Sequence, residues 1–205
     1  DGVNIWSVHE ALGGVEALAR FVDACHARGL GVCLDVVYNH LGPSGNTLID
    51  FGPYFTDSHT TPWGPAVNLD APQSDEVRRY IIDCELRWMR EFGADGLRLD
   101  AVHALVDTTA IHILEELSAE TEKLATQLGR PLALIAESDM NDPRIISDYS
   151  VGGYGLDAQW LDDVHHALHT VVTGENNAYY EDFGTVEILA DTLRHGYRFR
   201  NDYSR

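Results

Sequence analysis

The sequence has few basic residues, few cysteines and no long uninterrupted apolar run. Its 14 Lys and Arg face 33 Asp and Glu, which gives a formal net charge of −19. This charge argues against nucleic acid or an anionic membrane as a binding partner. No stretch is apolar enough over sufficient length to cross a bilayer, and nothing at Asp1 resembles a signal peptide. These absences predict a globular chain whose ligand is not a polyanion.

The three cysteines, Cys25, Cys33 and Cys84, fall in predicted helices and a predicted strand. Their spacing does not match a metal site, and their odd number does not suggest a disulfide framework. We therefore expect buried free thiols in a reducing compartment, and hence a cytoplasmic protein.

Apolar periodicity predicts an α/β fold. Strands are expected near residues 31, 96, 132 and 156, and helices over 15–28, 74–92, 107–128 and 162–172. Strands that alternate with helices indicate βα repeats and a parallel sheet. The strand at 31–37 is apolar on both sides, which predicts that both of its faces are covered. In the helix at 74–92, Trp88 is expected to be core.

The stretch GLRLDAVH, residues 96–103, carries charges where a buried strand should have none. Leu97 and Leu99 alternate with Arg98 and Asp100, so the leucines share one face of the strand and the charges share the other. Arg98 can hold the carboxylate of Asp100 ionised and oriented. A structural ion pair is the alternative interpretation of the same pattern.

Two other predicted strands also end in polar residues. The run DVVYNH, residues 35–40, ends in His40, and the strand near 132 ends in Glu137. The carboxyl ends of parallel strands are where α/β barrels and open sheets place their sites. Asp35 lies inside its strand, and we expect it to support neighbouring groups by hydrogen bonds rather than to contact a ligand directly.

These three segments resemble the first three conserved regions of the α-amylase superfamily, glycoside hydrolase family 13. The resemblance implies a (β/α)8 TIM barrel, which needs about 250 residues. With about four strands, residues 1–205 are expected to form a partial catalytic barrel domain with a long loop insertion at 39–72. Flanking barrel segments and a third catalytic carboxylate are expected outside this sequence, so we expect these residues alone to be inactive.

The resemblance also implies retaining glycoside hydrolysis, in which one carboxylate is the nucleophile and another the acid/base. Asp100 is then the nucleophile, kept charged by Arg98. Glu137 is then the acid/base, and partial desolvation after its apolar strand is expected to keep it protonated. His40 and His103 are expected to hydrogen-bond the sugars that flank the bond to be broken.

Longer loop segments narrow the resemblance within the superfamily. They comprise residues 39–46, 51–57, 61–64, 136–144 and 162–169. They resemble an enzyme that cleaves the α-1,4 bond joining a terminal trehalose unit to a malto-oligosaccharide. The alternatives are another α-glucan-active enzyme, such as a branching enzyme or an α-amylase-like hydrolase, and a non-catalytic glucan-binding half-barrel.

Five further residues are candidates for substrate binding. Tyr54 and Trp63 can stack on sugar rings, or they can form a small core that holds the 39–72 insertion. Asp139, Asp142 and Asp163 are expected to shape the leaving-group side of the site.

Two groups of polar residues are expected to have no catalytic role. His165, His166 and His169 share a predicted helix without a carboxylate or cysteine pattern beside them, so no metal is predicted. No cofactor is expected either. The acidic pairs Glu115–Glu116 and Glu120–Glu122 are interpreted as the solvated face of a helix.

Overall fold

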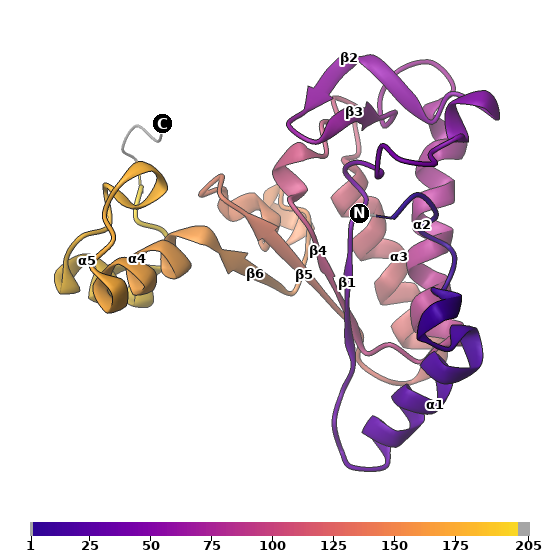
Figure 1. Cartoon of the computed structure of the whole chain (residues 1–205), viewed down its shortest axis with the longest axis horizontal. Helices are drawn as coiled ribbons and strands as arrows, with labels where there is room; N and C mark the ends of the chain where they lie inside the picture. The colour runs from indigo at the N-terminus through magenta and orange to yellow at the C-terminus, as the bar shows by residue number, and fades with distance from the viewer. Residues whose placement is uncertain (1, 201–205) are drawn as a thin grey trace.

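Four parallel strands, in the order β1-β4-β5-β6, form the centre of the computed structural model, which describes residues 2–200 (Figure 1). They are β1 (Cys33–Val36), β4 (Gly96–Leu99), β5 (Ala133–Ser138) and β6 (Ala158–Leu161). The spatial order follows the chain, and α2 (Ser74–Glu91) and α3 (Ile113–Leu128) lie on the same face of the sheet. A sheet wound in one direction with its helices on one face is part of a barrel rather than a doubly wound sheet. The predicted partial (β/α)8 fold is confirmed.

The pairing register determines which side chains share a face of this sheet. Asp35 pairs with Arg98, Arg98 with Ile135, and Glu137 with Trp160. Residues at the same level of paired strands, and residues two apart on one strand, point to the same side. Asp35, Arg98 and Glu137 therefore lie on the face opposite the helices.

The other face of the sheet forms the hydrophobic core with α2 and α3. Leu97 is fully buried, Leu99 and Leu134 are 1% exposed, and Met89 of α2 is fully buried. Each such side chain contributes about 1.5–3 kcal/mol when removed from water. Trp88 is 6% exposed, as predicted for a core residue. The alternation of leucine and charged residues in β4 thus places the hydrophobic core on one face of the sheet and the charged residues on the other.

Strand β1 differs from its prediction. It is an edge strand of the described sheet, and Cys33 and Asp35 are exposed on it. The expectation that both faces are covered is wrong, because Cys33 and Asp35 point to the face opposite the helices, and that face of β1 is exposed within the described residues. All three cysteines are free, as predicted, but only Cys84 is buried.

The 39–72 insertion is more regular than a loop. It contains a short 3₁₀ helix, η2 (Leu48–Asp50), and an antiparallel hairpin of β2 (Phe55–Thr61) and β3 (Gly64–Val67), with a register shift between Thr56 and Thr60. Asn68, buried after the hairpin, donates from Nδ2 to the carbonyl oxygens of Pro53 (3.0 Å) and Pro72 (3.2 Å). These bonds hold the hairpin over one end of the sheet (Figure 1).

Helix α3 begins at Ile113, six residues later than predicted, because Asp107 is used elsewhere. Its Oδ2 accepts from the backbone N–H of Ile113 (2.7 Å) and from Arg78 Nη1 (2.5 Å). Its Oδ1 accepts from the N–H of Thr109 (2.9 Å). Three bonds of this kind favour an irregular turn over a further helical turn.

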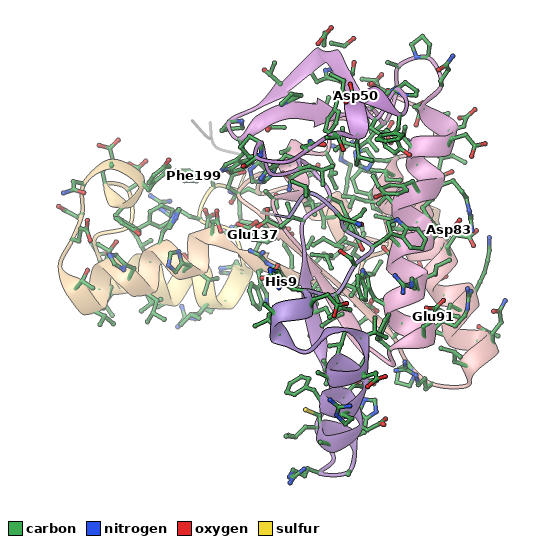
Figure 2. The ribbon with its side chains drawn as sticks, turned by 45° about the vertical axis from the view of Figure 1, so that its right-hand side comes forward. His9, Asp50, Asp83, Glu91, Glu137 and Phe199 are labelled. Atoms are coloured by element: carbon green, nitrogen blue, oxygen red, sulfur yellow. The ribbon has the colours of Figure 1, made fainter. Side chains whose placement is uncertain are left out.

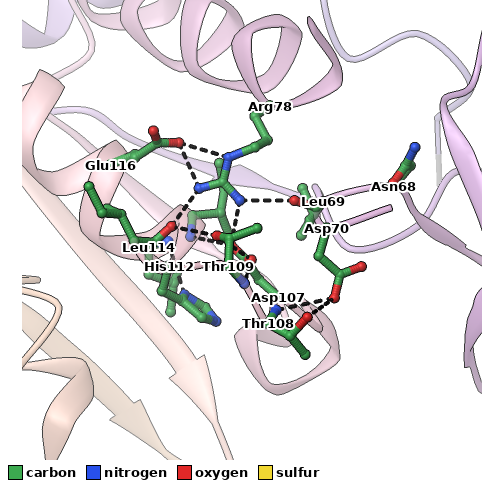
Figure 3. A network of polar contacts seen from close by, with 12 residues as sticks. Asn68, Leu69, Asp70, Arg78, Asp107, Thr108, Thr109, His112, Leu114 and Glu116 are labelled. Carbon is green, nitrogen blue, oxygen red and sulfur yellow. Dashed lines mark hydrogen bonds and ion pairs between the residues drawn. The ribbon is translucent and has the colours of Figure 1, made fainter. Parts of the chain in front are cut away.

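A buried arginine holds this turn in place, and we name it with its partners the Arg78 cluster (Figure 3). The guanidinium contacts the carboxylates of Asp107 and Glu116 and the carbonyl oxygens of Leu69 and Ile111. All three of its nitrogens are bonded. Glu116, interpreted from the sequence as a solvated residue, is instead a partner of Arg78, with its side chain 37% exposed.

The remaining elements flank the sheet. They are the helices α1 (Gly14–His26), α4 (Asp162–Thr173) and α5 (Val186–His195), and the 3₁₀ helices η1 (Glu10–Leu12), η3 (Val102–Ala104), η4 (Pro143–Ile145), η5 (Tyr149–Val151) and η6 (Ala178–Tyr180). Helices α1 and α4 were predicted, whereas α5 was not. The α4–α5 pair projects beyond β6 (Figure 1). Within residues 2–200, none of the helices has the length and apolarity to cross a membrane.

Candidate active site

Arg98 and three carboxylates form one cluster on the sheet face opposite the helices, here named the Arg98 cluster. Arg98 Nη1 lies 2.7 Å from Asp35 Oδ1 and 2.9 Å from Asp100 Oδ1. Arg98 Nη2 lies 3.5 Å from Glu137 Oε2. Burial acts to lower the pKa of Arg98, but the hydrogen bond to Asp35 and the surrounding negative charges raise it. One permanently charged group thus orients both predicted catalytic carboxyls.

Among the three carboxylates, Asp35 on the edge strand β1 is the most exposed. The side chain of Asp35 is 61% exposed, that of Asp100 25% and that of Glu137 20%. Asp100 follows β4 directly, and its N–H still donates to the carbonyl oxygen of Val36 (2.9 Å). The backbone ladder therefore places Asp100 and Glu137 at the carboxyl ends of neighbouring strands.

The peptide that follows Asp100 is held from both sides. Asn39 Nδ2 donates to the carbonyl oxygen of Asp100 (2.7 Å) and lies 3.2 Å from its Oδ2. The N–H of Ala101 donates to Glu137 Oε2 (2.6 Å). Ala101 has φ 41° and ψ 55°, a left-handed conformation that is unfavourable by roughly 1–2 kcal/mol for a residue with a side chain.

Asp100 and Glu137 open into a cleft of about 310 Å³. Its other lining residues are Trp63, Ala101, His103, Asp139, Asp162, His166 and Tyr179. Figure 2 shows Glu137 between the central sheet and the C-terminal helices. The volume suits a small-molecule site, and the walls combine aromatic rings with charged groups.

His40 and Trp63, which were both predicted to bind the substrate, contact each other beside this cleft. Their rings stack with centroids 5.1 Å apart and planes 20° from parallel. His40 is 3% exposed, its Nδ1 lies 2.5 Å from Asn39 Oδ1, and burial lowers its pKa. Trp63 is 44% exposed and lines the cleft. The ring of His40 therefore packs behind Trp63 and supports it, while Trp63 itself lines the cleft.

His103 and Asp139 lie side by side on the lining of the cleft. His103 Nδ1 lies 3.4 Å from Asp139 Oδ1 and, among the described residues, has no partner in hydrogen-bond geometry. Both side chains line the same cleft as Asp100 and Glu137. The structure thus brings together Asp35, Arg98, Asp100, His103, Glu137 and Asp139, as well as His40 and Trp63.

Tyr54 and Asp142 lie away from the cleft. The Tyr54 ring packs edge-on against Tyr80, 5.4 Å between centroids, beside a separate apolar space. This contact favours the small-core alternative for Tyr54. Asp142 accepts from Arg144 Nη2 (2.6 Å) and lines a different cavity of about 340 Å³. Partial burial acts to raise the pKa of Asp142, but the hydrogen bonds from Arg144 lower it below its usual value.

Asp163 lies in a neighbouring cavity of about 300 Å³ that shares Asp139, His166 and Tyr179 with the cleft. It is 6% exposed, and its Oδ2 accepts from the N–H of Arg198 (2.6 Å). Burial raises the pKa of Asp163. Its position extends the cleft toward the C-terminal helices rather than adding to the Arg98 cluster.

The histidines of α4 are used in ring contacts. His169 stacks on Tyr180, 4.2 Å between centroids, and its Nε2 lies 2.9 Å from Glu175 Oε2. In the part of the chain from residue 2 to residue 200, no three His, Cys, Asp or Glu side chains are grouped so as to hold a metal ion.

Several residues of the site were not predicted. Asn39 stands inside the motif at 35–40, where its place after the strand was a usable signal. Ala101 acts through its backbone, and Tyr179 reaches the cleft from the segment after α4. Nothing in the sequence pattern indicated Ala101 or Tyr179 as residues of the site.

Comparison with known proteins places this site in a family. No family model matches the chain. A malto-oligosyltrehalose trehalohydrolase from Mycobacterium tuberculosis is 63% identical over 204 residues, which cover 100% of this chain and 35% of that protein. A 1,4-α-glucan branching enzyme from Cupriavidus necator is 29% identical, over 82% of this chain and 25% of that protein.

A crystal structure of a candidate α-amylase from Salmonella typhimurium superposes with a TM-score of 0.84 at 37% identity, over 97% of this chain and 34% of that one. The singly wound sheet, the charged groups at its carboxyl ends and these similarities define the class, an α/β barrel of the α-amylase superfamily. Within that class, the chain belongs to the malto-oligosyltrehalose trehalohydrolase family. It spans about a third of the length of these relatives.

Proposed function

We propose that this chain supplies the nucleophile and the acid/base of a retaining glycoside hydrolase. The enzyme cleaves the α-1,4-glucosidic bond next to the terminal trehalose unit of maltooligosyltrehalose and releases trehalose. Family membership supports the substrate, and the Arg98 cluster supports the chemistry. We also propose that the whole chain, 1–205, belongs to one catalytic barrel domain.

In the first step, an Asp100 carboxylate oxygen bonds to the anomeric carbon as the bond from that carbon to the leaving oxygen breaks. Glu137 gives its proton to the leaving oxygen, and trehalose departs. In the second step, Glu137 takes a proton from water, whose oxygen bonds to the anomeric carbon as the bond to Asp100 breaks. The malto-oligosaccharide is then released and both carboxyls are restored.

One observation carries this proposal, namely the contact of a single guanidinium with both carboxyls. Arg98 hydrogen-bonds Asp100 (2.9 Å) and lies 3.5 Å from Glu137. A retaining mechanism requires two carboxyls about 5 Å apart, and a shared arginine is one way to hold them close without repulsion. The opposite protonation states expected for the two carboxyls stay a prediction.

Other groups around the cleft are proposed to bind the sugars. His103 and Asp139 present polar atoms beside both carboxyls, and Trp63 presents a ring face. Asp163 is proposed to act further along the leaving-group side. His40 and Asp35 are proposed to hold Trp63 and Arg98, while Tyr54 and Asp142 are proposed to shape the loops.

The protein's surroundings follow from composition. The formal net charge of −19 supports an uncharged α-glucan as partner rather than nucleic acid or an anionic membrane. Three free cysteines support a reducing, cytoplasmic location. Neither a cofactor nor a metal enters the proposed mechanism.

Two substitutions in the full-length protein test the chemistry. Asp100→Asn should abolish turnover of every substrate. Glu137→Gln should lower the rate on a natural glucan by roughly 10² to 10⁴ but spare an aryl glycoside whose leaving group needs no proton. Equal losses of Glu137→Gln on both substrates, or inversion at the anomeric carbon, would contradict the assigned roles.

Substrate choice is tested by comparing maltotriosyltrehalose with maltopentaose, which has the same number of glucose units. The proposed enzyme cleaves the first much faster and releases free trehalose. Equal rates would point to an α-amylase-like hydrolase, and a new branch in the product would point to a branching enzyme. Retention of glucan without any turnover would point to a binding module.

A further inference from the structure

The peptide between Asp100 and Ala101 joins three elements of the site. Its carbonyl oxygen accepts from Asn39 Nδ2 (2.7 Å), and its N–H donates to Glu137 Oε2 (2.6 Å). Asn39 follows β1, the Asp100–Ala101 peptide follows β4, and Glu137 lies in β5. A hydrogen bond accepted at the carbonyl polarises the N–H of the same peptide and strengthens its donation.

The conformation of Ala101 aims this N–H. With φ 41° and ψ 55°, Ala101 occupies the left-handed region that glycine adopts readily and alanine rarely. It is 3% exposed, and its carbonyl oxygen accepts from the N–H of Ala104 (2.9 Å), so η3 holds the other side of the residue. Backbone strain of this kind collects at functional sites.

The two oxygens of Glu137 are therefore unequal. Oε2 accepts the Ala101 N–H and lies 3.5 Å from Arg98 Nη2, so two positive or polarised groups already face it. A proton on Oε2 would compete with both of them. The remaining oxygen, Oε1, is the one free of this competition.

We infer that Ala101 is a positioning residue for the acid/base. Its N–H keeps Oε2 unprotonated, so that Oε1 carries the proton to the leaving oxygen and later takes one from water. This inference rests on the proposed function. It concerns which oxygen of Glu137 moves the proton, and it leaves the bonds formed and broken at the anomeric carbon unchanged.

Removal of the single N–H tests this role. Ala101 is replaced in the full-length protein by lactic acid, which turns the amide into an ester. An N–H donated to a carboxylate favours its ionised form, so the ester should displace the alkaline limb of the kcat/KM profile to higher pH. The rate on maltotriosyltrehalose should fall roughly tenfold to a hundredfold, part of the contribution of a general acid, and the rate on an activated aryl glycoside should fall far less.

The other charges that face Glu137 are the same in both proteins. They are Arg98 and Asp100 from the end of β4, His103 from η3, Asp139 after β5, and Asp162 and His166 from α4. The matched control is an ester at Leu105, whose N–H donates to the carbonyl oxygen of Val102 (3.1 Å). That control loses one backbone bond of the same loop without touching Glu137, and its alkaline limb should not move.

Three outcomes overturn the inference. One is an Ala101 ester with the parent's pH profile, and another is an equal displacement in the Leu105 ester. The third concerns Ala101→Val, whose branched side chain disfavours the left-handed region. We expect this variant to displace the alkaline limb of the kcat/KM profile to higher pH, as the ester does. A folded Val variant with the parent's profile contradicts the role. These results leave the proposed function standing, whereas a parent protein without glucan turnover overturns both.

Discussion

Two arginines in this molecule each gather carboxylates, and they differ in what remains around them. Arg78 is 6% exposed, and its Nε, Nη1 and Nη2 make five hydrogen bonds to Asp107, Glu116 and two carbonyl oxygens (Figure 3). Arg98 faces three carboxylates beside an open cleft, and within the described residues its buried Nε has no hydrogen-bond partner.

The difference separates a cluster that stabilises the fold from a cluster with a proposed catalytic role. In the Arg78 cluster every donor is matched, so nothing remains for a ligand. In both clusters the carboxylates outnumber the arginine, but in the Arg98 cluster the buried Nε has no hydrogen-bond partner among the described residues, and two of the carboxylates, Asp100 and Glu137, border a cavity. Charged groups left incompletely paired beside a cavity are unfavourable for stability and useful in a site. We therefore expect substitutions in the two clusters to move different measurements.

The largest expected effect is on stability, from Arg78→Met. The substitution leaves the Asp107 carboxylate, whose side chain is fully buried, without its countercharge. Breaking a buried ion pair in this way destabilises by about 3–5 kcal/mol. Urea unfolding should show this loss, with activity per folded molecule preserved. The neighbouring Arg79→Met, which breaks an exposed pair with Asp83 on the same helix, should change stability by less than about 1 kcal/mol.

Arg98→Met should reverse this pattern. Its partners are partly exposed, so we expect a change in unfolding free energy below about 1 kcal/mol. The rate on maltooligosyltrehalose should fall by roughly 10² to 10³, the size of effect seen when one preorganised charge-stabilising donor is removed. If Arg98→Met unfolds the protein and Arg78→Met abolishes catalysis, the contrast between the clusters is wrong.

A third buried ionisable residue, Glu85, has no arginine partner and sharpens the comparison. It lies in α2 with Oε1 2.5 Å from Thr121 Oγ1, and burial raises its pKa from 4.5 to about 8. The folded state thus holds a proton that the unfolded chain releases above pH 4.5. Stability should fall as pH rises from about 4.5 to 8, by about 3 kcal/mol at pH 7.

Glu85→Gln should remove this pH dependence, as followed by thermal unfolding between pH 5 and pH 8. Glu122→Gln provides the control, since Glu122 is an exposed acid on α3 and its replacement should leave the dependence unchanged. A parent protein whose stability is flat across this range would show that Glu85 is charged in the fold.

The smallest expected effect is that of Asp35→Asn. Asp35 is the most exposed partner of Arg98, and asparagine keeps an oxygen that can accept its hydrogen bond. We expect less than a tenfold loss of kcat with KM unchanged. A loss as large as that of Asp100→Asn would mean that Asp35 contacts the substrate directly.

The sequence predicted the parts of the fold that depend on local pattern. Alternating Leu97, Arg98, Leu99 and Asp100 indicated a strand with one charged face, and the register of β4 with its neighbours agrees. The four strands and the helices α1, α2 and α4 follow from periodicities of two and 3.6 residues. Glu137 was placed beside Asp100 because parallel strands end at one edge.

The failures share a different cause, which is contact between residues far apart in the chain. The partnership of Arg78 with Glu116 spans 38 positions, and neither residue shows it in its own surroundings. Asp107 looked like the start of a helix because its bond to Arg78 is not visible in sequence. For Tyr54 the sequence left two interpretations open, a sugar platform and a small core, because an exposed and a packed aromatic residue have the same local pattern.

The hydrogen-bonded register of β4 and β5 has a consequence for how this protein can change over generations. Asp100 and Glu137 are opposed to one another only because Leu99 pairs with Ala136. Deleting or inserting one codon within either strand would turn one of the two carboxyls toward the helices and abolish the proposed catalysis. The hairpin of β2 and β3 carries its own ladder, so codons can be gained or lost near Trp63 while the carboxyls keep their places. Length variation among descendants of this gene should therefore collect between residues 39 and 72 and spare the strands.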